Sequence, residues 1–263
     1  FSISLSICYH VYAFEMLISN GNLIASSRSL YLTANGGVSM ISGSGVFTYG
    51  TSTVNYTATS AVILPTNMNG TSGTNGFYNL AVGTSADATA VSYELGADTA
   101  VNNALTVGHA SSSAIDTVDL NSYILTLGGS GTPLNIISGK GAISSETSTI
   151  TYTSGSGAAA LSSVALTSGN ALYNLTINGT STFTAGVAVE AKNNLTVSGG
   201  TLAMGANDLT VGNSSVTDSG SIKVASGQSL TQTSTNTSTI LSSASGSNCI
   251  GSSGASCSGT AGT

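Results

Sequence analysis

The sequence has very few charged residues. Its 263 residues include four Lys or Arg and ten Asp or Glu, and charged residues make up 5% of the chain, about a fifth of the usual share in globular proteins. The basic residues are Arg28, Lys140, Lys192 and Lys223. Four dispersed cations do not form a phosphate-neutralising patch, so the sequence predicts no nucleic-acid partner.

Long apolar runs and helix-forming stretches are also missing. Ser, Thr, Asn and Gly interrupt every apolar run well before 18 residues, so no transmembrane helix is predicted. Ser and Thr account for 83 residues and Gly for 33. Because Ser and Thr compete with helical hydrogen bonds and Gly has a high entropy cost in a helix, this composition predicts an all-β protein.

The composition does not favour disorder, which requires low hydrophobicity together with high net charge. Hydrophobic residues make up 40% of the chain, the mean hydropathy is +0.30 and the net charge is −6. The aliphatic residues also form short alternating clusters, so we expect a folded core.

An internal repeat organises the middle of the chain. Four segments recur in the same order, at offsets that shrink from 96 and 95 to 90 and 84 residues. The matched segments are 51–57 with 147–153, 77–82 with 172–177, 103–107 with 193–197, and 125–128 with 209–212. The sequence therefore predicts two copies of one unit, about 30–125 and 125–209, and a partial third that ends near residue 227.

Short strands of the Leu-Thr-Val type, followed by Gly, Asn or Ser-Gly, recur about every ten residues within each copy. Such spacing is compatible with a solenoid, a barrel or a β-sandwich. We favour a solenoid over residues 21–227, because stacked coils tolerate loop-length changes between copies and because Thr and Asn recur beside the same Leu and Val positions. β-Sandwich domains are the alternative.

These strands also carry a family resemblance. The segments 77–80, 172–179, 193–202 and 209–212 resemble the repeats of large secreted bacterial surface proteins, namely adhesins and autotransporter passengers. The resemblance covers about residues 30–227 and implies a right-handed parallel β-helix. It implies no catalytic residues.

Residues 1–20 precede the repeat and begin with an alternating apolar pattern. The apolar positions are Phe1, Ile3, Leu5, Ile7, Tyr9 and Val11. Period 2 predicts a strand, although a remnant of a signal peptide is the other interpretation. We expect this segment to be buried, either as a cap on its own first coil or, preferably, as a donor strand inserted into the next subunit of a head-to-tail filament.

Residues 228–263 form a Ser/Thr/Gly-rich C-terminal cap or tail. Cys249 and Cys257 lie eight residues apart in this tail, with no His or carboxylate between them. We predict a disulfide that closes this loop, with two unpaired thiols as the alternative. Cys8 remains without a predicted partner.

Residues suited to catalysis are few, and we predict neither an enzyme nor a bound metal or cofactor. Only His10 and His109 could serve as histidine bases. The closest carboxylate pair, Asp116 and Asp119, would point to opposite faces of an extended strand. A polysaccharide-active β-helix, which would need two or three cooperating carboxylates, is the enzymatic alternative.

Two further features concern glycans. Seven Asn-x-Ser/Thr sequons mark candidate glycosylation sites, a number that composition alone explains: Asn55, Asn69, Asn174, Asn178, Asn194, Asn213 and Asn236. Tyrosines recur at equivalent positions as Tyr56/Tyr152 and Tyr78/Tyr173. Such tyrosines could stack on sugars, but we favour structural packing.

From the sequence we expect a non-enzymatic extracellular or cell-surface protein, an adhesin-like stalk or filament subunit that self-assembles. A glycan-binding β-helix module or a polysaccharide-active enzyme is the alternative.

Overall fold

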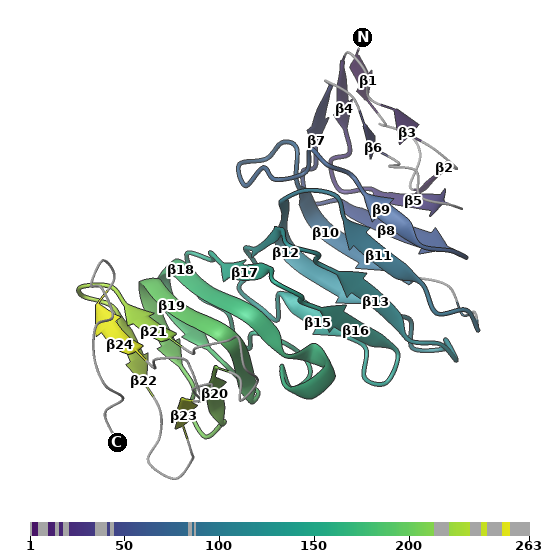
Figure 1. Cartoon of the computed structure of the whole chain (residues 1–263). Coiled ribbons are helices and arrows are strands. Elements are labelled where there is room, and N and C mark those ends of the chain that lie inside the picture. The colour runs from purple at the N-terminus through teal and green to yellow at the C-terminus, as the bar shows by residue number, and fades with distance from the viewer. Residues whose placement is uncertain are drawn as a thin grey trace.

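The computed structural model is a parallel β-helix of about eight turns, whose coils follow one another from the N-terminal to the C-terminal end of an elongated body (Figure 1). It describes residues 2–4, 10–13, 16–17, 21–34, 41–42, 45–83, 86, 88–212, 221–231, 238–240 and 249–252. Every pair of named strands in these ranges is parallel. The predicted solenoid is therefore confirmed, and the β-sandwich alternative is wrong.

The described strands form four sheets. Two small sheets lie in the N-terminal coils: β1 (Ser2–Ser4), β4 (Asn22–Ile24) and β7 (Val46–Thr48) in one, and β3 (Met16–Leu17) and β6 (Ile41–Ser42) in the other. A four-stranded sheet contains β9 (Val62–Leu64), β11 (Ser92–Leu95), β13 (Asp116–Asp119) and β16 (Gly141–Ser144).

The largest sheet has 15 strands and runs the length of the molecule. It contains β2 (His10–Ala13), β5 (Ser29–Ala34), β8 (Thr53–Ala58), β10 (Phe77–Val82), β12 (Thr99–Val107), β14 (Ile124–Leu127), β15 (Leu134–Ile136), β17 (Thr149–Tyr152), β18 (Leu172–Thr184), β19 (Val189–Ala203), β20 (Leu209–Val211), β21 (Ser221–Val224), β22 (Ser229–Thr231), β23 (Ser238–Ile240) and β24 (Cys249–Ser252). The helical segment in the described residues is a 3₁₀ turn, η1 (Ser168–Asn170).

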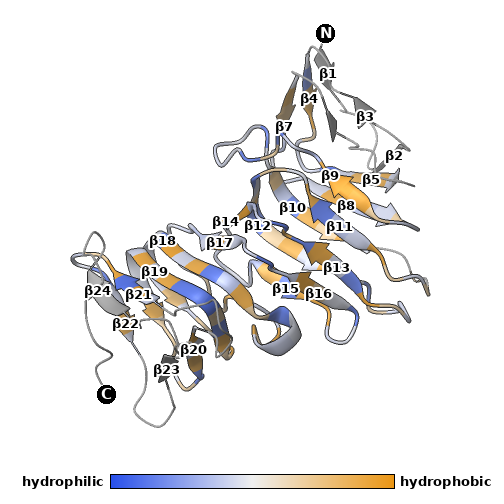
Figure 2. Cartoon of the chain, in the orientation of Figure 1, coloured by the Kyte–Doolittle hydropathy of each residue, from blue (hydrophilic) through white to orange (hydrophobic). Residues whose placement is uncertain are grey.

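The core is a set of columns of inward-facing side chains. Alternate residues of each strand point inward, which produces the banded hydropathy of the strands in Figure 2. In one of these columns, Val54 on β8 lies beside Leu80 and Leu80 lies beside Leu105, and each is at most 1% exposed. Burial of these aliphatic columns is the main favourable contribution to folding.

The two copies of the sequence repeat form the same pattern of strand pairing. The column Val54–Leu80–Leu105 in the first copy corresponds to Ile150–Leu175–Leu195 in the second. Both β12 and β19 are long strands that pair with more than one following strand: β12 pairs with β14 and β15, and β19 pairs with β20, β21 and β22. Leu80 and Leu175 are both buried, as the repeat predicts.

The two copies do not lie directly in line. β17, the counterpart of β8 in the second copy, continues the ladder of β14 on the first half of β12. The ladder on the second half of β12 ends after β15, with one isolated bridge from Leu134 to Ser162. The second copy is therefore displaced sideways by one strand position.

Both ends of the predicted solenoid extend further than residues 21–227. Of the predicted assembly strand, Ser2–Ser4 pairs with β4 and His10–Ala13 pairs with β5, which lie in two different sheets. These segments pair within their own chain, as the capping alternative predicts. Phe1, Leu5, Ile7 and Tyr9 lie outside the described residues, and donation to a neighbouring subunit stays a prediction. At the other end, β24 pairs with β21.

Candidate functional site

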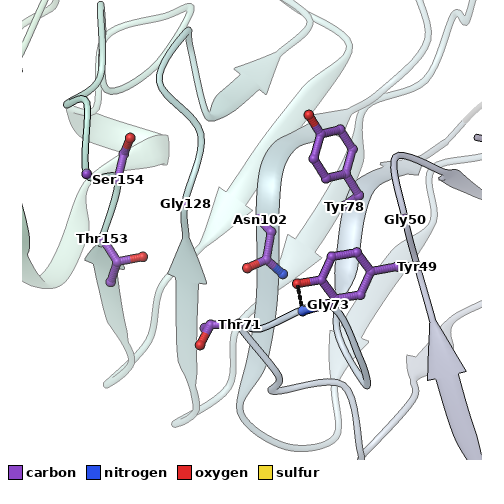
Figure 3. A pocket seen from close by; sticks show the side chains of 10 residues that line it. Tyr49, Gly50, Thr71, Gly73, Tyr78, Asn102, Gly128, Thr153 and Ser154 are labelled. Carbon is purple, nitrogen blue, oxygen red and sulfur yellow. Dashed lines mark hydrogen bonds between the residues drawn. The ribbon is translucent and has the colours of Figure 1, made fainter. Parts of the chain in front are cut away.

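A groove of about 560 Å³ opens on the surface of the first half of the molecule (Figure 3). Its lining residues come from five successive coils. They are Tyr49, Gly50, Thr71, Gly73, Tyr78, Asn102, Gly128, Thr153, Ser154 and Gly155. The volume lies within the range of small-ligand sites.

The floor of the groove follows one corner of the coil. Asn102 lies on β12, Gly128 directly follows β14, and Thr153 directly follows β17. The backbone N–H of Gly128 donates to Val101 (2.9 Å), and that of Thr153 donates to Leu127 (2.9 Å). A Cβ atom at Gly128 would lie 3.1 Å from the Asn102 carbonyl oxygen. Glycine at position 128 therefore lets the backbone after β14 lie close to that of β12.

Two tyrosines form one wall of the groove. Tyr49 is 5% exposed, and its hydroxyl oxygen accepts a hydrogen bond from the Gly73 N–H (2.7 Å; Figure 3). This contact fixes the loop around Gly73, whose φ of +93° suits glycine. Tyr78 on β10 is half-buried and packs against the core. Its ring is the more accessible of the two.

Asn102 has a fixed orientation. Its amide nitrogen donates to the carbonyl oxygens of Gly70 (3.1 Å) and Phe77 (2.9 Å). Both amide hydrogens are thereby used, and the amide oxygen remains as an acceptor at the groove. This arrangement presents an oriented polar group beside an aromatic ring.

None of the lining residues carries a charge at neutral pH. A second groove, of about 430 Å³, differs in this respect because Glu146 and Lys192 lie among its lining residues. With one carboxylate, that groove does not contain the pair of acids that glycoside hydrolysis requires.

The two carboxylates considered from the sequence accept hydrogen bonds from backbone N–H groups. Asp116 is buried, and its Oδ1 accepts a hydrogen bond from the Val91 N–H (3.1 Å). Asp119 lies half-buried on the opposite face of β13 and accepts from the Asn121 N–H (2.9 Å). The two acids therefore lie on opposite faces of the strand, as strand geometry predicts. Among the described residues, no three His, Cys, Asp or Glu side chains gather as a metal site.

Of the remaining titratable candidates, the structure describes the side chain of His109. The Nδ1 atom of His109 accepts a hydrogen bond from the Ser111 N–H (3.2 Å) at a turn. The side chains of His10 and Cys249 and all of Cys257 lie outside the described residues. The predicted disulfide stays a prediction.

The sequons in the described part of the chain divide into two groups. Asn69 and Asn178 are exposed. The side-chain nitrogens of Asn55, Asn174 and Asn194, to which a glycan would be attached, donate hydrogen bonds to the preceding coil. Asn213 and Asn236 lie outside the described residues. The described geometry therefore suits glycosylation best at Asn69 and Asn178.

Several of the repeated asparagines form ladders between coils. In the first copy, Asn103 donates to Asn79 (2.7 Å), and Asn79 donates to the Thr53 hydroxyl (3.3 Å). In the second copy, Asn193 and Asn194 donate to Asn174 (2.9 and 3.1 Å), and Asn174 donates to Thr149 (3.4 Å). The repeat motif thus encodes the same polar ladder twice.

The recurring tyrosines separate into core and surface residues. Tyr56 and Tyr152 are fully buried, and burial raises the pKa of each phenol well above its usual value. Packing is therefore the correct interpretation for this pair. Tyr78 lines the groove, whereas its repeat equivalent Tyr173 does not.

Sequence reasoning missed Tyr49, Asn102 and Gly128. No local motif marks these residues, because the length of each intervening coil decides which residues become neighbours at the groove.

Comparisons with protein-family models, with curated proteins and with solved structures find no match to this chain. No helix in the described part of the chain is long and apolar enough to cross a membrane.

Proposed function

We propose that this chain is a non-enzymatic, extracellular structural protein that acts as a stiff spacer, in the manner of an adhesin stalk. The observation that carries the proposal is the continuity of the coil. Parallel ladders and inward columns connect each described coil to the next from β8 to β21.

Side chains strengthen these contacts between coils. Asp98 accepts a hydrogen bond from the Ile124 N–H (2.9 Å), and Asn170 accepts one from the Ile143 N–H (3.0 Å). Ser163 donates to the Ile136 carbonyl and accepts from the Ile136 N–H, both at 2.8 Å. Polar side chains that could serve catalysis elsewhere are thus used to join neighbouring coils.

A spacer role predicts an extended, inflexible particle. With neighbouring strands about 4.8 Å apart, eight turns extend about 40 Å along the coil axis. Small-angle scattering and electron microscopy of the purified chain should show short rods, or filaments if the coils also join end to end. A compact or flexible particle would contradict the proposal.

The enzymatic alternative is tested separately. We expect no release of reducing ends when the chain is incubated with a panel of neutral and acidic polysaccharides. Release that is lost when a carboxylate is replaced, for example in Glu146→Gln, would overturn the non-enzymatic proposal.

A further inference from the structure

We propose that the groove lined by Tyr78, Asn102 and Thr153 binds an extended, neutral oligosaccharide. A rigid spacer needs no ligand, so this proposal goes beyond the spacer role, and the two can fail independently.

The lining combines the two kinds of contact that a pyranose ring uses. Tyr78 supplies an aromatic ring on which the C–H face of a sugar can stack. The Asn102 amide oxygen, held in place by the hydrogen bonds to Gly70 and Phe77, supplies an oriented acceptor for a sugar hydroxyl. Thr71 and Thr153 add hydroxyl groups that can donate or accept.

The absence of charged side chains in the groove favours neutral over acidic carbohydrates. Because no charged side chain lines it, a uronic acid or a sulfated sugar would enter without a partner for its anion. A desolvated anion without a partner is strongly disfavoured. The proposed ligand is therefore neutral.

The direction of the groove favours a linear chain over a single sugar. Tyr78, Asn102, Gly128 and Thr153 come from four successive coils, which places the ends of this row about 14 Å apart, given the spacing between parallel strands. Gly128 lies between Asn102 and Thr153 in this row (Figure 3) and carries no side chain that could project into the groove.

A peptide strand fits this surface less well. Strand addition needs an open sheet edge with unpaired backbone groups. Here the adjoining strands β10, β12, β14 and β17 are paired within the coil stack. Side-chain recognition of a polar ligand is what the groove offers.

The test is calorimetric titration of the full chain with hexasaccharides built from glucose, mannose, galactose or N-acetylglucosamine, beside an oligogalacturonate as the acidic probe. We expect at least one neutral hexasaccharide to bind with a millimolar or lower Kd, more tightly than its disaccharide. Failure of all four neutral probes, or binding of the acidic probe alone, would overturn the proposal.

Two variants localise the binding. Tyr78→Ala should weaken it at least tenfold, and Thr153→Arg should block the groove without removing a core residue. The matched control is Tyr173→Ala, which removes the equivalent ring outside the groove and should leave Kd unchanged. Unchanged binding in both groove variants, or equal loss in Tyr78→Ala and Tyr173→Ala, would show that the sugar binds elsewhere.

Discussion

Tyr56 and Tyr152 occupy equivalent buried positions in the two copies of the repeat, but their hydroxyl groups differ in hydrogen bonding. The Tyr152 hydroxyl donates to the Leu161 carbonyl (2.9 Å). The Tyr56 hydroxyl has no partner within the part of the chain that the structure describes. The difference arises because the segments that follow β8 and β17 take different paths: the first contains β9 and the second contains η1.

This difference predicts opposite effects of the same substitution. Tyr152→Phe should lower the free energy of unfolding by about 1–2 kcal/mol, because it removes a buried hydrogen bond and leaves a carbonyl without its donor. Tyr56→Phe should be neutral or stabilising, because it removes a buried polar atom that has no partner. Denaturant unfolding of both variants measures the two values, and equal losses would contradict this assignment.

The same two phenols predict a loss of stability in alkali. Burial raises the pKa of Tyr56 and Tyr152 in the folded chain, while in the unfolded chain the phenols ionise near pH 10. Below pH 10 both states keep the proton, and above it ionisation favours the unfolded state. The free energy of unfolding should therefore fall as the pH rises above about 10. Replacing both tyrosines by Phe should reduce that slope.

Asn174 should contribute more to stability than its equivalent Asn79. The Asn174 side chain accepts hydrogen bonds from Asn193 and Asn194 and donates to Ser148 and Thr149, whereas the Asn79 side chain accepts one from Asn103 and donates one to Thr53. Asn174→Ala should lower the free energy of unfolding by about 2–3 kcal/mol and Asn79→Ala by about 1 kcal/mol, following the number of bonds lost. Thermal and denaturant unfolding provide the comparison. A larger loss in Asn79→Ala would contradict the ladder model.

Glu146 and Gly50 occupy equivalent corners, 96 residues apart, and both have a left-handed backbone, with φ of +36° and +54°. Glu146→Gly should relieve strain and raise the free energy of unfolding by up to about 1 kcal/mol. Gly50→Ala should lower it, because the new Cβ would lie 2.3 Å from the Ser26 carbonyl oxygen. Denaturant unfolding measures the change in the free energy of unfolding for both variants. Destabilisation in Glu146→Gly would show that the contacts of the Glu146 side chain contribute more to stability than the backbone strain costs.

The repeat was the part of the fold that the sequence predicted best. Matches such as 77–82 with 172–177 reflect positions that must be apolar inside the coil and polar outside it, so they specify both strands and their pairing order. The sideways displacement at β14 and β15 was not predictable, because it depends on which half of β12 the next coil pairs with. The full extent of the solenoid was also not predictable, because its outer strands lie in segments that do not carry the repeat.

The candidate groove was likewise only partly predictable from the sequence. Tyr78 was recognisable as a recurring tyrosine, but nothing local distinguished it from Tyr173, which lies outside the groove. Asn102 and Gly128 become neighbours because the chain between them closes one coil. Small changes in that length would place a different residue at the corner.

The sequence by itself determined an all-β fold of short repeated strands with an apolar interior, since alternation of apolar and hydroxyl residues sets strand faces locally, and it favoured a solenoid over a β-sandwich without excluding the sandwich. Only the tertiary structure decided which coils lie in register, which asparagines join in ladders and where Tyr78, Asn102 and Thr153 meet. Those relationships connect residues about 25 positions apart, and their geometry depends on the length and path of each connecting loop.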